Sequence, residues 1–353
     1  MKKLIILFLL AAQVARAQDK GTVRTDTIVS AVLGYSVTHE NRKRAVSIYL
    51  PPGYATGNKR YPVLYLLHGI GDNNMDFMDD SLKSYGSVEE LMDKGIASHR
   101  LKPMIIVTPN EKTNFYGSFY TNSASTGNWE DFTVKELVGY MDRNYRTIPK
   151  SGSRAIAGHS MGGYGALMLA MKHPDVFSVA YGMNSALIGF VGDFSAGDEQ
   201  MRKFVEAKTF ADFDRLYKNK DYIAVGALTV AQAFSPNPAH PPFYADKPYK
   251  EKGGKIVPNP LAYKEWEAHD VVHMAPHYIT NLLKLKAIQF DSGTEDAYTF
   301  IPVNNRLFSK KLTELHVPHQ FEEYNGDHRN RLWGPDGRIN KSLLPFISSH
   351  LSN

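Results

Sequence analysis

The chain has 353 residues, a composition ordinary for a globular protein and a formal net charge of +5 at pH 7. Three of its basic residues lie in the first 17 positions, and without that segment 38 basic and 36 acidic residues remain. This nearly even balance of charges excludes the strongly basic surface that binding to nucleic acid or to anionic lipid requires. The length is sufficient for one large α/β domain with a well-buried core.

The first 17 residues have the pattern of a secretory signal peptide. Lys2 and Lys3 precede a short apolar run at 4–12, and residues 15–17 read Ala-Arg-Ala, a small-x-small cleavage site. The run is too short to cross a bilayer as a helix. The chain has no cysteine, so it has neither disulfides nor a site for lipid attachment. We expect a soluble exported protein, periplasmic or secreted, without a membrane anchor; a buried N-terminal strand or helix is the alternative.

Strand patterns of two kinds follow along the chain. Residues 22–50 mix β-branched and polar residues in rough alternation, which is typical of antiparallel strands. The later candidates are short apolar runs that end in Gly or Pro-Asn, as strands buried on both faces do. These runs, together with the final candidate strand, occupy 61–69, 104–110, 153–160, 176–186, 285–293 and 319–326.

Helical patterns separate these strands. They cover 129–145, 162–173, 303–315 and 340–351. Asn128 precedes the first of them, and its side chain is expected to cap that helix. Strands that alternate with helices predict an α/β fold, with a mostly parallel central sheet covered by helices on both faces.

One segment, 190–265, breaks the alternation and is dense in Pro, Tyr and Phe. A connection of that length inside a compact domain is usually functional, often a lid or a binding loop. We therefore predict a single domain over 18–353, with 190–265 as a lid-like insertion over the active site. A surface insertion without function is the alternative.

Ser160 lies between two glycines, in Gly158-His-Ser160-Met-Gly162, where a strand pattern meets a helix pattern. This Gly-x-Ser-x-Gly elbow makes so tight a turn that the flanking positions have no room for side chains, and the serine projects above the sheet. A serine hydroxyl is a weak nucleophile that needs a positioned base. The pattern predicts Ser160 as a catalytic nucleophile.

An elbow of this kind predicts an acid and then a histidine, each after a later strand. The segment 287–300 offers Asp291, at the end of a strand, and Asp296, in the loop beyond it. Asp296 is better placed to reach across to a histidine, and Asp291 is the alternative. His328 follows turn residues after the final strand and is the predicted base.

The negative charge that develops on the substrate oxygen needs two backbone N–H donors. Met161, directly after the nucleophile, is expected to supply one. Ile70, in the loop after the strand at 61–69, is expected to supply the other. His68 precedes that loop and is interpreted as a structural residue of the turn.

Histidines at 269, 273 and 277 are spaced four residues apart, which places the first two on one face of a helix. Pro276 interrupts that helix, and no HExxH pattern is present. We therefore expect no metal site and no cofactor.

These motifs resemble those of the esterase D-like family of α/β-hydrolases, which includes the feruloyl and acetyl-xylan esterases of carbohydrate esterase family 1. The resemblance runs from about residue 30 to the C-terminus and is carried by VSIYLPPGY (46–54), YPVLYLLHGIGDN (61–73), GHSMGGYGAL (158–167), FDSGTEDAY (290–298) and YNGDH (324–328). It implies a serine esterase in which the last acidic residue of the acid loop, Asp296, is catalytic. The resemblance does not specify the acyl group of the substrate.

An exported esterase meets polymers and nutrients outside the cytoplasm, which favours feruloyl or acetyl esters of carbohydrates as small-molecule or polysaccharide substrates. Aromatic side chains that can stack on a phenolic acid or a sugar face are expected to bind them. The candidates are Tyr120, Phe234, Phe243 and Tyr244. An acyltransferase, an esterase of siderophores or other small esters, and a non-catalytic carbohydrate-binding relative are the alternatives.

Overall fold

The computed structural model describes residues 20–79 and 86–352. The expected signal peptide at 1–17 lies outside these residues. Within them, no helix has both the length and the apolar character needed to cross a membrane.

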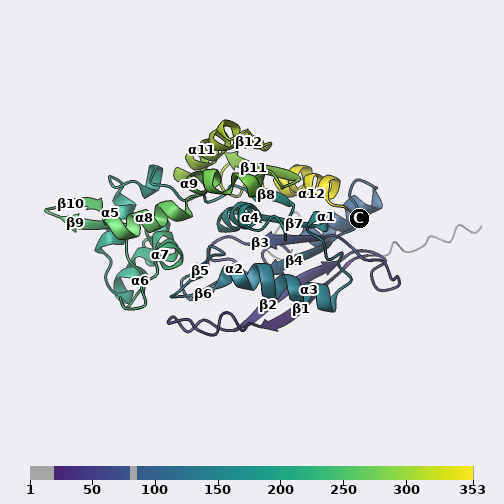
Figure 1. The fold of residues 1–353 in the computed structure, drawn as a ribbon, viewed down its shortest axis with the longest axis horizontal. Helices are drawn as coiled ribbons and strands as arrows, with labels where there is room; N and C mark the ends of the chain where they lie inside the picture. The colour runs from purple at the N-terminus through teal and green to yellow at the C-terminus, as the bar shows by residue number, and fades with distance from the viewer. Residues whose placement is uncertain (1–19, 80–85, 353) are drawn as a thin grey trace, which may run out of the picture.

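A mixed sheet of eight strands forms the centre of the molecule (Figure 1), in the order β1-β2-β4-β3-β7-β8-β11-β12. β2 pairs antiparallel with β1 and with β4, and all other neighbours pair in parallel. The strands are β1 (Thr22–Val29), β2 (Lys43–Leu50), β3 (Val63–Leu67), β4 (Ile105–Pro109), β7 (Arg154–His159), β8 (Val179–Met183), β11 (Ala287–Gly293) and β12 (Gln320–Tyr324). Every predicted strand is present, and the mostly parallel α/β sheet is confirmed.

Some of the α-helices cover the two faces of this sheet, and others, in and next to the segment 190–265, gather at one end of the molecule. The helices are α1 (Val88–Ala97), α2 (Trp129–Asp131), α3 (Val138–Asn144), α4 (Met161–Lys172), α5 (Glu199–Glu206), α6 (Phe210–Lys218), α7 (Tyr222–Phe234), α8 (Pro260–His269), α9 (Val271–Met274), α10 (Ile279–Leu282), α11 (Phe300–Glu314) and α12 (Leu344–His350). One buried cluster contains α1 and α12, and the other contains α3, α4 and α11.

Strand β3 shows why the central runs are apolar at every position. Leu64 and Leu66 belong to the cluster with α1 and α12, whereas Val63, Tyr65 and Leu67 belong to the cluster with α4. Successive side chains of a strand point to opposite faces, so a strand covered on both faces is buried throughout. The continuous apolar runs therefore predicted these strands correctly.

The helical segment after Asn128 differs from its prediction in two ways. Its first turn (α2) is followed by a π-helical stretch, Phe132–Leu137, before α3. The Asn128 side chain makes no capping hydrogen bond. The Oδ1 atom of Asn122 instead accepts from the N–H of Asp131 at 3.1 Å, since Asn122 lies opposite Asn128 in the short β5–β6 pair (Asn122–Ser123 and Gly127–Asn128).

The segment 190–265 is largely helical. It contains α5, α6, α7 and most of α8, with a hairpin of β9 (Tyr249–Lys252) and β10 (Lys255–Pro258), and these elements gather at one end of the molecule (Figure 1). The cluster beside α4 continues into this segment through buried residues such as Phe204 and Phe213. Sequence periodicity did not show α7, because this helix is buried on nearly all sides and is apolar almost throughout.

Candidate active site

Ser160 sits at the strand-to-helix turn that the sequence predicts. β7 ends at His159 and α4 begins at Met161, and Ser160 between them has φ 57° and ψ −118°. A positive φ is strained for a residue with a side chain, and such strain is found preferentially at functional sites. The turn thus holds the serine at the N-terminus of α4, where backbone N–H groups have no intrahelical acceptor.

The two glycines of the elbow are required by close backbone packing. A Cβ atom on Gly162 would overlap the carbonyl of Leu67 at the end of β3 and lie 2.8 Å from the carbonyl oxygen of His68. A Cβ atom on Gly158 would overlap the backbone of Gly162 itself. Backbone atoms cannot move aside as a flexible side chain can, so both positions accept only glycine.

Gly162→Ala is therefore expected to lower stability by about 1–3 kcal/mol, the usual range for overpacking, and to lower kcat/KM as well. Activity falls because the displaced end of β3 leads directly into the loop of Ile70. Thermal unfolding and ester hydrolysis measure the two effects. Gly197→Ala is the matched control, since a Cβ atom there meets nothing within 4 Å. Wild-type stability and activity in Gly162→Ala would show that the contact relaxes without consequence.

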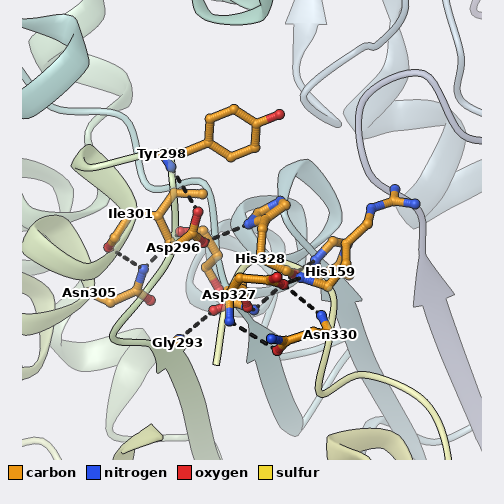
Figure 2. A network of polar contacts seen from close by, with 12 residues as sticks. His159, Gly293, Asp296, Tyr298, Ile301, Asn305, Asp327, His328 and Asn330 are labelled. Carbon is orange, nitrogen blue, oxygen red and sulfur yellow. Dashed lines mark hydrogen bonds and ion pairs between the residues drawn. The ribbon is translucent and has the colours of Figure 1, made fainter. Parts of the chain in front are cut away.

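The structure brings the predicted acid and base together. Nδ1 of His328 donates to Oδ2 of Asp296 at 2.7 Å, and the backbone N–H of Tyr298 donates to the other carboxylate oxygen at 2.9 Å (Figure 2). The Asp296 carboxylate is fully buried, whereas the His328 side chain remains 14% exposed. Because Nδ1 carries the proton, Nε2 of the neutral imidazole holds the free lone pair that a general base needs.

The alternative acid, Asp291, has different partners. It lies within β11 and is fully buried, where it accepts from Tyr181 Oη at 2.6 Å and from Arg338 Nε at 3.0 Å. Burial raises the pKa of the Asp291 carboxyl, and the Arg338 guanidinium opposes that rise. Asp291 thus takes part in a buried ion pair, and Asp296 is the carboxylate that contacts His328.

Two buried side chains that the sequence did not single out hold the backbone of His328. Nε2 of His159 contacts the His328 carbonyl oxygen at 2.9 Å, and Nδ2 of Asn184 donates to the same oxygen at 3.1 Å. Burial lowers the pKa of His159 well below its ordinary value, so its ring is neutral and donates through Nε2–H. Asn184 also accepts from the N–H of Gly293 at 2.6 Å, which ties the acid loop to the histidine loop. Only the position of His159 inside the pentapeptide could have indicated this role.

His68 orients the loop of Ile70. Nε2 of His68 accepts from the N–H of Glu111 at 2.9 Å, and Nδ1 therefore donates to the Gly69 carbonyl oxygen at 2.8 Å. Burial lowers the pKa of His68 to about 4, so the ring is neutral. The Gly69 carbonyl and the Ile70 N–H belong to one trans peptide and point in opposite directions. By holding the carbonyl, His68 sets the direction of that N–H, which fits the predicted structural role.

A cavity of about 580 Å³ lies beside these groups, and its lining includes Ser160, His328 and Ile70. Its inner wall is formed by buried apolar side chains, among them Phe194 and Ile301. The helical segment 190–265 contributes further wall through α6 and α7. The cavity thus combines an exposed hydroxyl, an imidazole and an apolar chamber.

The four aromatic residues expected to bind substrate do not line this cavity. Tyr120, Phe234 and Phe243 are buried in the core, and the Tyr120 hydroxyl donates to the carbonyl oxygen of His68 at 2.9 Å. The backbone of Tyr244 hydrogen-bonds within the segment 190–265. This corrects the prediction: Tyr120, Phe234 and Phe243 pack the core instead of facing the cavity, and Tyr244 lies outside the cavity lining.

The spaced histidines also have separate partners. His269 stacks on Phe234 with ring centroids 4.6 Å apart, and His273 contacts Asp270 at 2.8 Å. Across residues 20–79 and 86–352, no group of three or more His, Cys, Asp or Glu side chains is arranged to hold a metal ion.

Comparisons with known proteins show what this chain is similar to. The model of the esterase family, described as "Putative esterase", matches residues 37–336. Esterase MT1326 of Mycobacterium tuberculosis is 35% identical over 139 residues, which are 38% of this chain and 27% of that protein. An endo-1,4-beta-xylanase/feruloyl esterase of Xylanibacter ruminicola is 32% identical over 140 residues, 38% of this chain and 19% of that protein. These matches therefore span only about a quarter or less of the curated relatives.

Solved structures agree on the fold. A ferulic acid esterase superposes with a TM-score of 0.61 and 24% identity, over 94% of this chain and 99% of the other. A CE1 ferulic acid esterase from Anaeromyces mucronatus, with ferulic acid bound, gives a TM-score of 0.53 and 17% identity, over 95% of this chain and 92% of the other. The family model covers most of the chain, including the elbow and the loops of Asp296 and His328, so this chain belongs to the esterase family, the α/β-hydrolase group that its motifs resemble.

Proposed function

We propose that this protein is an exported serine carboxylic-ester hydrolase that acts on feruloyl or acetyl esters of carbohydrates. One observation carries the hydrolase part: His328, with its Nδ1 bound by the buried Asp296 carboxylate, lines the same cavity as the elbow serine Ser160. An unrelated use of that cavity would not require an acid, an imidazole and a strained serine on three separate loops.

The proposed reaction proceeds through an acyl-enzyme. Ser160 Oγ attacks the ester carbonyl while His328 Nε2 takes the hydroxyl proton. The N–H groups of Met161 and Ile70 bind the oxyanion that forms. The imidazolium, stabilised by Asp296, donates its proton to the leaving alcohol. Water then attacks the acyl-enzyme by the same proton route and releases the acid.

The substrate class rests on the cavity and on the relatives. The cavity, of about 580 Å³, has an apolar inner wall suited to an aromatic acyl group, and three of the similar proteins described above are named as feruloyl or ferulic acid esterases. The helical segment 190–265 supplies part of the wall, which supports its role as a lid-like element that selects substrates.

A substrate panel tests this proposal on the mature protein. Methyl ferulate, acetylated xylan and p-nitrophenyl esters of increasing acyl length are compared by kcat/KM. We expect feruloyl or acetyl sugar esters to be hydrolysed better than long-chain esters. A maximum at the longest acyl chain, with no turnover of sugar esters, would instead make the protein a lipid-type esterase. Hydrolysis of none of the esters would contradict the hydrolase assignment.

A further inference from the structure

Three tyrosines other than the four predicted aromatic residues form one edge of the cavity. Tyr116 lies in the loop after β4, Tyr217 in the last turn of α6 and Tyr222 at the first position of α7, and all three line the cavity. We call them the tyrosine rim. The rings of Tyr116 and Tyr217 are stacked, with centroids 5.4 Å apart and an interplanar angle of 7°, and Tyr222 meets Tyr217 edge-on at 6.2 Å.

The tyrosine rim leaves much aromatic surface in contact with water. Tyr217 and Tyr222 are each 48% exposed, whereas the inner lining residues Phe194 and Ile301 are 2% and 1% exposed. Single exposed apolar residues are common on proteins, but a contiguous aromatic group at the mouth of a cavity marks a binding surface. The cavity therefore has an enclosed apolar part, suited to an acyl group, and an open aromatic part, suited to the alcohol portion of an ester.

The backbone of Tyr116 connects the tyrosine rim to the loop of Ile70. Tyr116 has φ 77°, a left-handed conformation that is rare for a residue with a side chain. Such conformations are strained and persist where the surroundings enforce them. Here the carbonyl of Tyr116 accepts from the N–H of Gly71 at 2.9 Å, immediately after Ile70. The same strained turn thus positions the ring of Tyr116 and supports the predicted oxyanion donor.

Charged side chains line the same cavity as the tyrosine rim. Nζ of Lys112 lies 5.7 Å from the centre of the Tyr116 ring, and Arg329 pairs with Asp72 at 2.5 Å on the cavity lining. An alkyl alcohol would leave these charged groups without hydrogen-bonding partners from the ligand. A sugar ring has apolar C–H faces for the tyrosine rings and hydroxyls at its edge for the charged side chains.

We propose that the tyrosine rim binds the sugar rings of the alcohol portion of the substrate, so that Tyr116, Tyr217 and Tyr222 determine the preference for carbohydrate esters. This inference rests on the proposed function and deepens it. The enclosed part of the cavity holds the acyl group, and the rim stacks on the esterified sugar and its neighbours. The insertion, through α6 and α7, thereby recognises the polysaccharide, whereas the loops that follow the strands of the sheet supply the catalytic residues.

The test compares two esters with one acyl group, methyl ferulate and a feruloylated arabinoxylan oligosaccharide. Tyr217→Ala and Tyr222→Ala are expected to lower kcat/KM for the oligosaccharide ester about three- to tenfold more than for methyl ferulate, mainly through KM, because each stacking contact is worth about 0.5–1.5 kcal/mol. Tyr217→Phe, which keeps the ring, is expected to retain most of the preference. Tyr35→Ala is the control, since Tyr35 is 93% exposed and lies outside the cavity lining.

Equal losses on both esters would overturn the proposal, because the tyrosines would then shape the acyl part of the cavity or the fold. Wild-type kcat/KM values for both esters in Tyr217→Ala and Tyr222→Ala would overturn it as well. If the wild-type protein hydrolyses neither ester, the proposed function is wrong, and the role of the tyrosine rim is then tested separately. That test measures the binding of unesterified arabinoxylan oligosaccharides by calorimetry. Binding that weakens in Tyr217→Ala and Tyr222→Ala supports the tyrosine rim, and binding that they leave unchanged, or no binding to the wild-type protein, refutes it.

Discussion

Ser160→Ala is expected to lower kcat for ester hydrolysis by on the order of 10⁴-fold or more, because the serine, histidine and acid act as a unit. The residual rate would come from the oxyanion donors and from substrate binding. Turnover of p-nitrophenyl acetate by the purified mature protein measures the loss. Thermal unfolding of the same sample shows whether the variant is folded.

A second substitution at the same position separates chemistry from strain. Ser160 has φ 57°, which glycine adopts without cost and alanine does not. Ser160→Gly should therefore be as inactive as Ser160→Ala but more stable, by about 1 kcal/mol. Retention of most hydrolysis in either variant would rule out Ser160 as the nucleophile.

Asp296→Asn is expected to lower kcat by about 10⁴-fold, as the corresponding change does in serine hydrolases, because an amide can hold the imidazole in the wrong tautomer. Its effect on stability should be small, since the amide oxygen can still accept from the N–H of Tyr298. Kinetics and thermal unfolding on the same preparation test both statements.

Asp291→Asn is the matched comparison and should behave in the opposite way. It breaks a buried ion pair with Arg338, a change that usually costs about 3–5 kcal/mol. The folded fraction should keep much of its turnover, since Asp291 does not contact His328. Loss of turnover in Asp291→Asn with a normal Tm, and near wild-type turnover in Asp296→Asn, would reverse the assignment of the acid.

Local sequence was sufficient for the elbow and for the sheet around it. The glycines at 158 and 162 are demanded by contacts within one strand-turn-helix unit and the strand next to it, so their spacing carries the information directly. Apolar runs without alternation predicted the central strands, because burial on both faces removes polar positions from a strand. The order of Ser160, the acid and His328 along the chain could be predicted from the elbow and from the positions of the later strands.

Only the tertiary structure determines which carboxylate contacts His328 and which aromatic rings line the cavity. Asp291 and Asp296 are five positions apart in the sequence, and only the loop from β12 to His328 determines which carboxylate meets the imidazole. The aromatic rings at the edge of the cavity belong to Tyr116, Tyr217 and Tyr222. Of the residues first expected there, Tyr120, Phe234 and Phe243 pack the core, and Tyr244 lies outside the cavity lining. Composition cannot distinguish a ring that faces a cavity from one that faces a core, because it counts aromatic residues without placing them in space. That distinction depends on how segments distant in the chain are packed together.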